Sequence, residues 1–155
     1  MNQQGDSQGI GSDLQQWAEG GRQNALELAK MLGVSEHAFA QDPLSLIPAL
    51  QNYVSRLPLS QFEQSDWATL HGDLTSFLAD ALVRRHRATW QLADDPTGPL
   101  GFRYVIEAQG LDGDLHRVDP ADVVLVEFQK QPIEIVRMLA SAELTLRLSR
   151  NVEDS

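Results

Sequence analysis

Through the first half of the chain, apolar residues recur at spacings of three and four, as on one face of an amphipathic helix. We expect a first helix that begins at a Ser12 cap and ends before Gly33, because a Ser hydroxyl accepts hydrogen bonds from free N–H groups and Gly suits the residue after a helix. Gly20 and Gly21 interrupt the stripe and indicate either a kink or a later start near Arg22. The stripe comprises Leu14, Trp17, Ala18, Ala25, Leu28 and Leu32.

The next segment combines helical spacing with prolines. Ser35 is expected to cap a short helical turn. With Ser45 as the cap of the following helix, Pro48 falls at the third helical position, where its missing N–H has no intrahelical partner to lose. Pro58 then ends that helix. Its predicted buried stripe is Ile47, Leu50, Val54 and Leu57.

The most regular helical pattern follows, with Ser65 or Asp66 as its predicted cap. One face of this segment is apolar for more than four turns, which predicts the central core helix. The residues of that face are Trp67, Leu70, Leu74, Phe77, Leu78, Ala81 and Leu82.

Beyond this helix the apolar period changes from 3.6 to 2, which predicts strands. Trp90 and Leu92 alternate with polar residues in a short first strand. The segment 94–99 is a turn, residues 102–109 alternate again, and residues 110–114 form a second turn before a strand over 115–118. The pattern predicts a three-stranded antiparallel meander.

Residues 120–129 fit two interpretations. Asp119 and Pro120 have the chemistry of a helix start, whereas the β-branched run 123–126 also suits a buried strand. We favour a short helix. A last helix is predicted to begin near Pro132 and to bury Ile133, Val136, Leu139, Ala140 and Leu144.

These elements predict an α+β fold in which three N-terminal helices pack on a small antiparallel sheet, with a C-terminal helix beside them. We expect one domain over 12–150, because no linker or repeat divides it. Residues 1–11, rich in glycine and glutamine, are predicted to be a disordered tail, and residues 151–155 a frayed one.

The formal net charge of −10, from 22 acidic and 12 basic side chains, disfavours nucleic-acid binding and favours a basic protein partner. With no cysteine, the chain cannot form disulfides or a zinc–thiolate site. The first eleven residues lack the apolar core of a secretory signal, and no window is apolar enough to span a membrane. A cytoplasmic location is therefore expected.

Few side chains suggest chemistry. His71 lies at the edge of the core stripe, but Asp73 is two residues on and so points elsewhere on the helix, which predicts a half-buried structural histidine. The acidic turns suit a hard cation through oxygen ligands, yet Asp and Gly are also what turns require and the spacing matches no calcium loop. We expect no metal there. The residues of these turns are Asp94, Asp95, Asp112 and Asp114.

No GxSxG elbow, phosphate-binding loop or dinucleotide motif occurs, so we predict neither a cofactor nor catalytic residues. The basic cluster Arg84, Arg85 and Arg87 lies in the last turn of the core helix, where positive charge offsets exposed carbonyl groups. Together with the four turn aspartates, this cluster makes up our predicted partner-binding residues.

The run from Leu70 to Arg85, the strand residue Trp90, the hairpin and the Asp119-Pro120 step resemble a pattern in uncharacterised small α+β proteins of actinobacteria. Ala79 stands where such proteins often carry glycine. The resemblance spans about half of the chain and implies the fold without implying an activity. In size, charge and class the chain is also similar to immunity proteins and secretion chaperones.

We therefore expect a non-enzymatic, acidic protein-binding module, immunity-like or chaperone-like, that contacts a basic partner through its acidic turns and exposed sheet edge. One alternative is a small-ligand-binding protein or hydrolase-like enzyme built on His71 and the acidic turns. A second alternative is a homodimeric structural subunit that pairs through the aromatic-rich hairpin.

Overall fold

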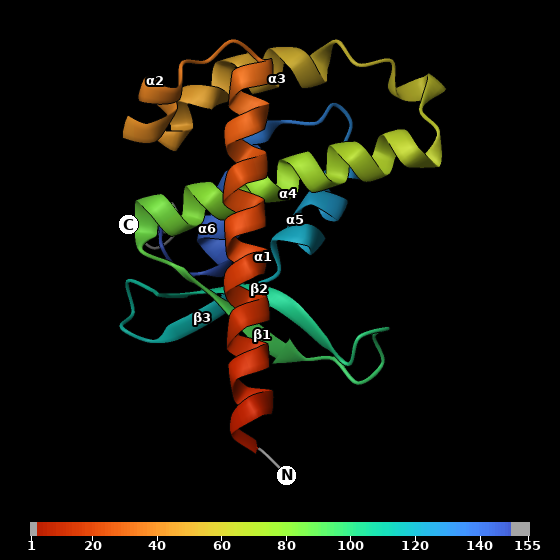
Figure 1. Cartoon of the computed structure of the whole chain (residues 1–155). Coiled ribbons are helices and arrows are strands. Elements are labelled where there is room, and N and C mark those ends of the chain that lie inside the picture. The colour runs from red at the N-terminus through yellow and green to blue at the C-terminus, as the bar shows by residue number, and fades with distance from the viewer. Residues whose placement is uncertain (1–2, 150–155) are drawn as a thin grey trace.

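A computed structural model of the chain describes residues 3–149 (Figure 1). The predicted frayed tail over 151–155 lies outside these residues. In chain order, the elements are α1 (Gln3–Met31), α2 (Glu36–Gln41), the 3₁₀ turn η1 (Pro43–Leu46), α3 (Ile47–Ser55), the 3₁₀ turn η2 (Leu59–Gln61), α4 (Gln64–His86), β1 (Thr89–Asp94), β2 (Phe102–Gln109), β3 (Leu115–Val118), α5 (Pro120–Phe128) and α6 (Ile135–Thr145). The predicted α+β class is confirmed.

The layers are arranged around α4. In Figure 1, α2 and α3 lie on one side of α4 and the sheet lies on the other, while α1 runs across all of them. Contacts from the N-terminal helices to the sheet come from α1 on β1 and from α4 on β2. The core therefore follows α4, whose residues Leu74, Phe77, Leu78 and Leu82 are fully buried.

Helix α1 differs from its prediction at its N-terminal end. It begins at Gln3 rather than at a Ser12 cap, so residues 3–11, predicted as a disordered tail, continue the helix. Once packed residues further along have nucleated a helix, each added residue costs little, and glutamine is a good helix former. Gly20 and Gly21 lie inside one continuous helix, which therefore has no separate start near Arg22.

Two of the predicted caps are displaced. Ser35 caps α2 as expected, since its hydroxyl accepts a hydrogen bond from the Ala38 N–H at 3.0 Å. Ser45 is not a cap, because Asp42 caps η1 instead, and its side chain accepts a hydrogen bond from the Leu44 N–H at 2.9 Å. The extra 3₁₀ turn delays α3 to Ile47 and leaves the Ser45 hydroxyl buried without a partner.

Helix α4 begins earlier than either predicted cap. Glu63 is the N-cap and forms a reciprocal capping box with Asp66, whose carboxylate accepts a hydrogen bond from the Glu63 N–H at 3.0 Å. This arrangement satisfies two free N–H groups at once, which a Ser65 cap would not do. Asp66 is thus the third helical residue rather than the cap.

The sheet has the strand order β1-β2-β3 with antiparallel neighbours, so the predicted meander is confirmed. In its register, Trp90 lies opposite Ile106, and Ile106 lies opposite Val118. Ile106 is fully buried against the helices. The helices therefore cover the middle of β2.

The second half resolves the ambiguity at residues 120–129. The segment is the helix α5, capped by the Asp119 side chain, as we favoured. Helix α6 begins at Ile135 rather than near Pro132, and its predicted stripe is wrong in part, because Val136, Ala140 and Leu144 are exposed. The helix is apolar on more than one side, so spacing alone could not fix its rotation. The buried residues are Ile135, Met138, Leu139 and Ala142.

One ion pair and one histidine–carboxylate contact set the rotation of α6. The Arg137 guanidinium donates to the buried Glu127 carboxylate of α5 at 2.6 Å. At the other end of α6, His86 Nε2 and a Glu143 carboxylate oxygen lie 2.6 Å apart, which joins α6 to the end of α4. Residues between these two contacts can bury only one face.

Candidate functional site

The two acidic turns lie at opposite ends of the sheet. Asp94 is the last residue of β1 rather than part of the predicted turn, and Asp95 follows it, whereas Asp112 and Asp114 lie in the turn after β2. Because β2 separates them, and a strand rises about 3.4 Å per residue, its eight residues hold the turns about 25 Å apart. The sheet therefore offers two separate acidic ends.

The first turn belongs to a charged cluster around Arg103 on β2. The Arg103 guanidinium lies 3.3 Å from Asp95, 3.2 Å from Asp119 and 2.8 Å from Asp122. Three carboxylates thus surround one cation, which leaves this end of the sheet negative. The negative charges of Asp122 and Asp95 raise the pKa of Arg103. The pKa of Asp119 is also raised, mainly because the carboxyl group is partly buried and secondly because the Asp122 charge is nearby.

The second turn is held by its own contacts. Asp112 accepts a hydrogen bond from the Asp114 N–H at 3.0 Å and lies 2.8 Å from His116 Nε2. The Asp114 N–H, and then the His116 ring, lower the pKa of Asp112. Gly110 is required here, because a Cβ would lie 2.7 Å from the Arg147 Cβ. The Asp and Gly residues of this turn are therefore accounted for by the hydrogen bonds and close packing of the turn itself.

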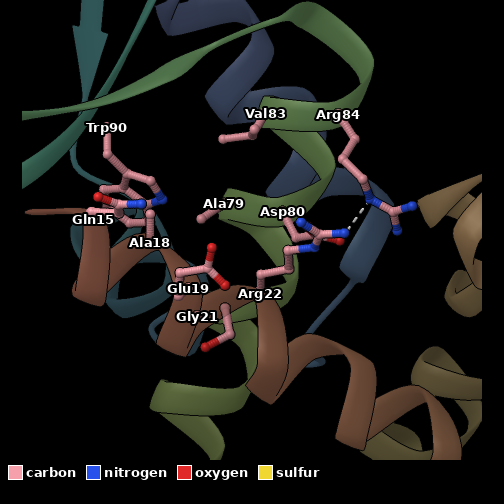
Figure 2. Close-up of a pocket in the computed structure, with 11 residues that line it drawn as sticks. Gln15, Ala18, Glu19, Gly21, Arg22, Ala79, Asp80, Val83, Arg84 and Trp90 are labelled. Atoms are coloured by element: carbon pink, nitrogen blue, oxygen red, sulfur yellow. Dashed lines mark hydrogen bonds and ion pairs between the residues drawn. The ribbon is translucent and has the colours of Figure 1, made fainter.

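The predicted arginine cluster is divided by the structure. Arg84 is structural, since its Nε donates to Asp80 at 3.0 Å and its Nη1 to the Ala40 carbonyl at 3.0 Å (Figure 2). Its guanidinium also lies over the Phe39 ring, 4.6 Å from the centroid. Arg85 is exposed, and Arg87 is exposed in a left-handed conformation with φ of 55° that ends α4.

His71 and Asp73 do not come together. His71 Nε2 lies 2.9 Å from the Ala121 carbonyl, and a carbonyl only accepts, so Nε2 carries the proton. Asp73 accepts instead from the Asn24 side chain of α1, and burial raises its pKa. Among the residues that the structure describes, no group of three His, Asp or Glu side chains is placed to hold a metal ion.

The outer edge of β1 is open. The Asp95 N–H donates to the Gly101 carbonyl, so Asp95 and Gly101 form a hydrogen-bonded pair. In an antiparallel ladder, hydrogen-bonded and non-hydrogen-bonded pairs alternate along the strand. Thr89, Gln91 and Ala93 therefore point their backbone groups at β2. The backbone groups of Trp90, Leu92 and Asp94 point outward, and no backbone or side-chain group that the structure describes forms a hydrogen bond with them.

An aromatic cluster borders this edge on the side facing α1. Trp17 stacks on Tyr104 with ring centroids 3.9 Å apart, and meets Trp90 edge-on at 5.9 Å. Phe102 lies edge-on to Tyr104 at 5.5 Å. Trp17 is 44% exposed, so the cluster is only partly covered. It offers apolar surface immediately beside the unpaired backbone of β1.

Sequence reasoning missed Asp80 and the stacking of Trp17. Asp80 was detectable, because it falls among the buried positions of α4 with Arg84 one turn later, the spacing of a helical ion pair. Burial raises the pKa of Asp80 although Arg84 opposes the shift. The contact between Trp17 and Tyr104 joins distant parts of the chain, so no local pattern indicates it.

Comparison with protein-family models, curated proteins and solved structures finds no match to this chain. The resemblance to small actinobacterial proteins therefore stays a prediction. Within residues 3–149, no helix is both long enough and apolar enough to cross a membrane.

Proposed function

We propose that this chain is a non-enzymatic protein-binding module that receives an extended, basic segment of a partner protein as an added strand along β1. The open edge of β1 is the observation that carries this proposal. Trp90, Leu92 and Asp94 direct backbone donors and acceptors outward along a strand of six residues. Main-chain pairing of this kind supplies affinity without a deep pocket.

The side chains around β1 suit such a segment. One face of an added strand would meet the aromatic cluster of Trp17, Trp90 and Tyr104. At the end of β1, exposed Asp94 and the negative cluster around Arg103 favour Lys or Arg on the partner. The partner segment should therefore alternate apolar and basic residues.

The other edge of the sheet is less suited to pairing. Strand β3 has only four residues, and by the same alternation its outward backbone groups belong to Leu115 and Arg117. Helix α6 packs against this strand, and the Leu111 N–H donates to the Arg147 carbonyl beside it. Short, covered edges resist strand addition.

The test is the binding of a synthetic peptide with alternating Lys and Val, measured by fluorescence anisotropy at about 50 mM and about 500 mM salt. We expect binding that weakens about tenfold or more at the higher salt, and no binding of an alternating Glu–Val peptide. Affinity that does not change with salt, or equal binding of both peptides, would overturn the proposal.

The variant Leu92→Pro removes one outward N–H and should abolish binding of the Lys–Val peptide. Leu115→Pro is the matched control, because it removes an outward N–H from the edge strand β3. Circular dichroism verifies that both variants keep their secondary structure. If Leu115→Pro abolishes binding while Leu92→Pro does not, the partner adds at β3 and the assignment to β1 is wrong.

A further inference from the structure

A cleft of about 360 Å³ lies between α1 and α4, on the helical side of the sheet (Figure 2). This volume is at the lower end of the range for small-molecule sites. One wall is apolar and consists of Ala18, Ala79, Val83 and Trp90. The opposite end is charged, with Glu19 and Arg22 from α1 and Asp80 and Arg84 from α4.

The cleft is not filled by its own helices. Gly21 lines it and Gly20 lines an adjoining hollow beside Trp90, and a Cβ at either position would have no other atom within 4 Å. Glycine inside a helix costs about 1 kcal/mol relative to alanine, and close packing does not explain the glycines here. Their effect is to leave the mouth of the cleft open.

Asp80 is the most buried charged residue of the cleft. Its side chain is only 5% exposed, and its Oδ2 accepts from Arg84 Nε at 3.0 Å. Its Oδ1 forms no hydrogen bond with any side chain or backbone group described in the structure, and Asp80 lines the cleft. A carboxylate oxygen in this position is an acceptor for a ligand.

The two arginines differ in availability. The Arg84 guanidinium contacts Asp80, the Ala40 carbonyl and the Phe39 ring, and its Nη2 is buried without an acceptor among the described residues. Arg22 is exposed at the cleft and forms no hydrogen bond or ion pair with the described side chains, although its positive charge opposes the effect of burial on the pKa of Asp80. Glu19, also exposed, has none either. The Arg22 guanidinium and the Glu19 carboxylate therefore keep hydrogen-bonding groups that no described side chain uses.

We infer that the cleft binds a small zwitterion, namely a free α-amino acid with an apolar side chain. The ammonium group would lie between Asp80 Oδ1 and Glu19, the carboxylate would face Arg22, and the side chain would lie against Ala79, Val83 and Trp90. Two carboxylates and two guanidiniums balance in the cleft, so a ligand without net charge keeps it neutral, and a zwitterion in addition meets both signs of charge. This site shares Trp90 with the aromatic cluster beside β1, but its ligand groups come from α1 and α4, and the inference does not depend on the proposed function.

The probe is L-leucine, compared with N-acetyl-L-leucine, which lacks the ammonium group, and L-leucinamide, which lacks the carboxylate. Binding is followed by the indole N–H signals in ¹⁵N-labelled protein. We expect L-leucine to shift the Trp90 signal. Both derivatives should bind at least about tenfold more weakly than L-leucine. Trp67 is the internal control, because it lies outside the cleft. No shift at Trp90 with millimolar L-leucine overturns the inference, as does equal binding of the derivatives.

Substitutions at Arg22 and Glu19 test separately how the cleft binds the carboxylate and the ammonium group of L-leucine. Arg22→Gln should weaken L-leucine about tenfold and leave L-leucinamide unchanged, whereas Glu19→Gln should weaken both. Arg85→Gln is the matched control on α4, because Arg85 is exposed and does not line the cleft. If Arg22→Gln and Arg85→Gln have the same effect on L-leucine, the carboxylate does not face Arg22 and the proposed pose is wrong.

Discussion

The indole ring of Trp17 lies flat on the phenol ring of Tyr104, with centroids 3.9 Å apart and planes inclined by 3°. This contact fixes the N-terminal half of α1 over β2. It also gives the sheet its helix-facing aromatic surface, because Trp90 packs edge-on against the same indole. The packing of α1 on the sheet and the shape of the proposed binding surface therefore depend on one pair of rings.

Trp17→Ala should lower the free energy of unfolding by about 1–2 kcal/mol, since it removes the stacked ring and the apolar area that the ring covers. Urea unfolding followed by circular dichroism measures this loss. Trp17→Phe keeps a ring in place and should lose about half as much. An unchanged midpoint in Trp17→Ala would mean that α1 does not depend on this contact.

Arg84→Met should destabilise the protein by about 3 kcal/mol, because it leaves the Asp80 carboxylate buried without its cation. The double variant Asp80→Asn with Arg84→Met should lose less than Arg84→Met alone, since the buried charge is then absent. Chemical denaturation of the wild type, both single variants and the double variant forms a complete cycle. Strictly additive effects would show that the two side chains are not coupled.

Gly20→Ala and Gly21→Ala should each stabilise the protein by about 1 kcal/mol, because both residues are helical and a methyl group meets no other atom. Thermal unfolding measures this gain. A methyl group at Gly21 also narrows the cleft, so L-leucine should bind Gly21→Ala more weakly than Gly20→Ala, because Gly20 does not line the cleft. Gly33→Ala is a useful contrast, since φ of 81° at Gly33 strains any other residue and should cost stability.

Asp73→Asn should stabilise the protein at neutral pH. Burial raises the folded-state pKa of Asp73 above its ordinary value of 3.8, so the native state binds the proton more tightly than the unfolded chain does. Ionisation of Asp73 therefore costs stability above the raised pKa, and the cost disappears as pH falls below 3.8. Urea titrations at pH 7 and about pH 3 should show an advantage for Asp73→Asn only at pH 7.

The sequence predicts the type of most elements because the periods of α4 and the meander are unambiguous. It fails where two local solutions compete. Ser65 is a good cap on its own, but the reciprocal pair of Glu63 and Asp66 satisfies more of the helix start. In α6, Val136 and Met138 are both apolar, and contacts with the distant residues Glu127 and His86 decide which of them is buried.

The candidate site was predictable to a smaller degree. The acidic turns and the exposed sheet edge follow from composition and strand order. The cluster that joins Arg103 to Asp119 and Asp122 requires the register of β2 and the entry angle of α5, which no local spacing encodes. The cleft beside Asp80 likewise requires the crossing of α1 and α4, which tertiary packing alone determines.

The unpaired backbone of β1 also has a consequence for molecules of the same kind. Two copies that met edge to edge would satisfy each other's free groups and seed fibrous aggregates. The net charge of −10 on every copy opposes this encounter while drawing in strands of opposite sign. The carboxylates thus oppose strand pairing between copies of the chain by electrostatic repulsion. Acidification protonates them and weakens this repulsion, so the same edge should then promote self-aggregation.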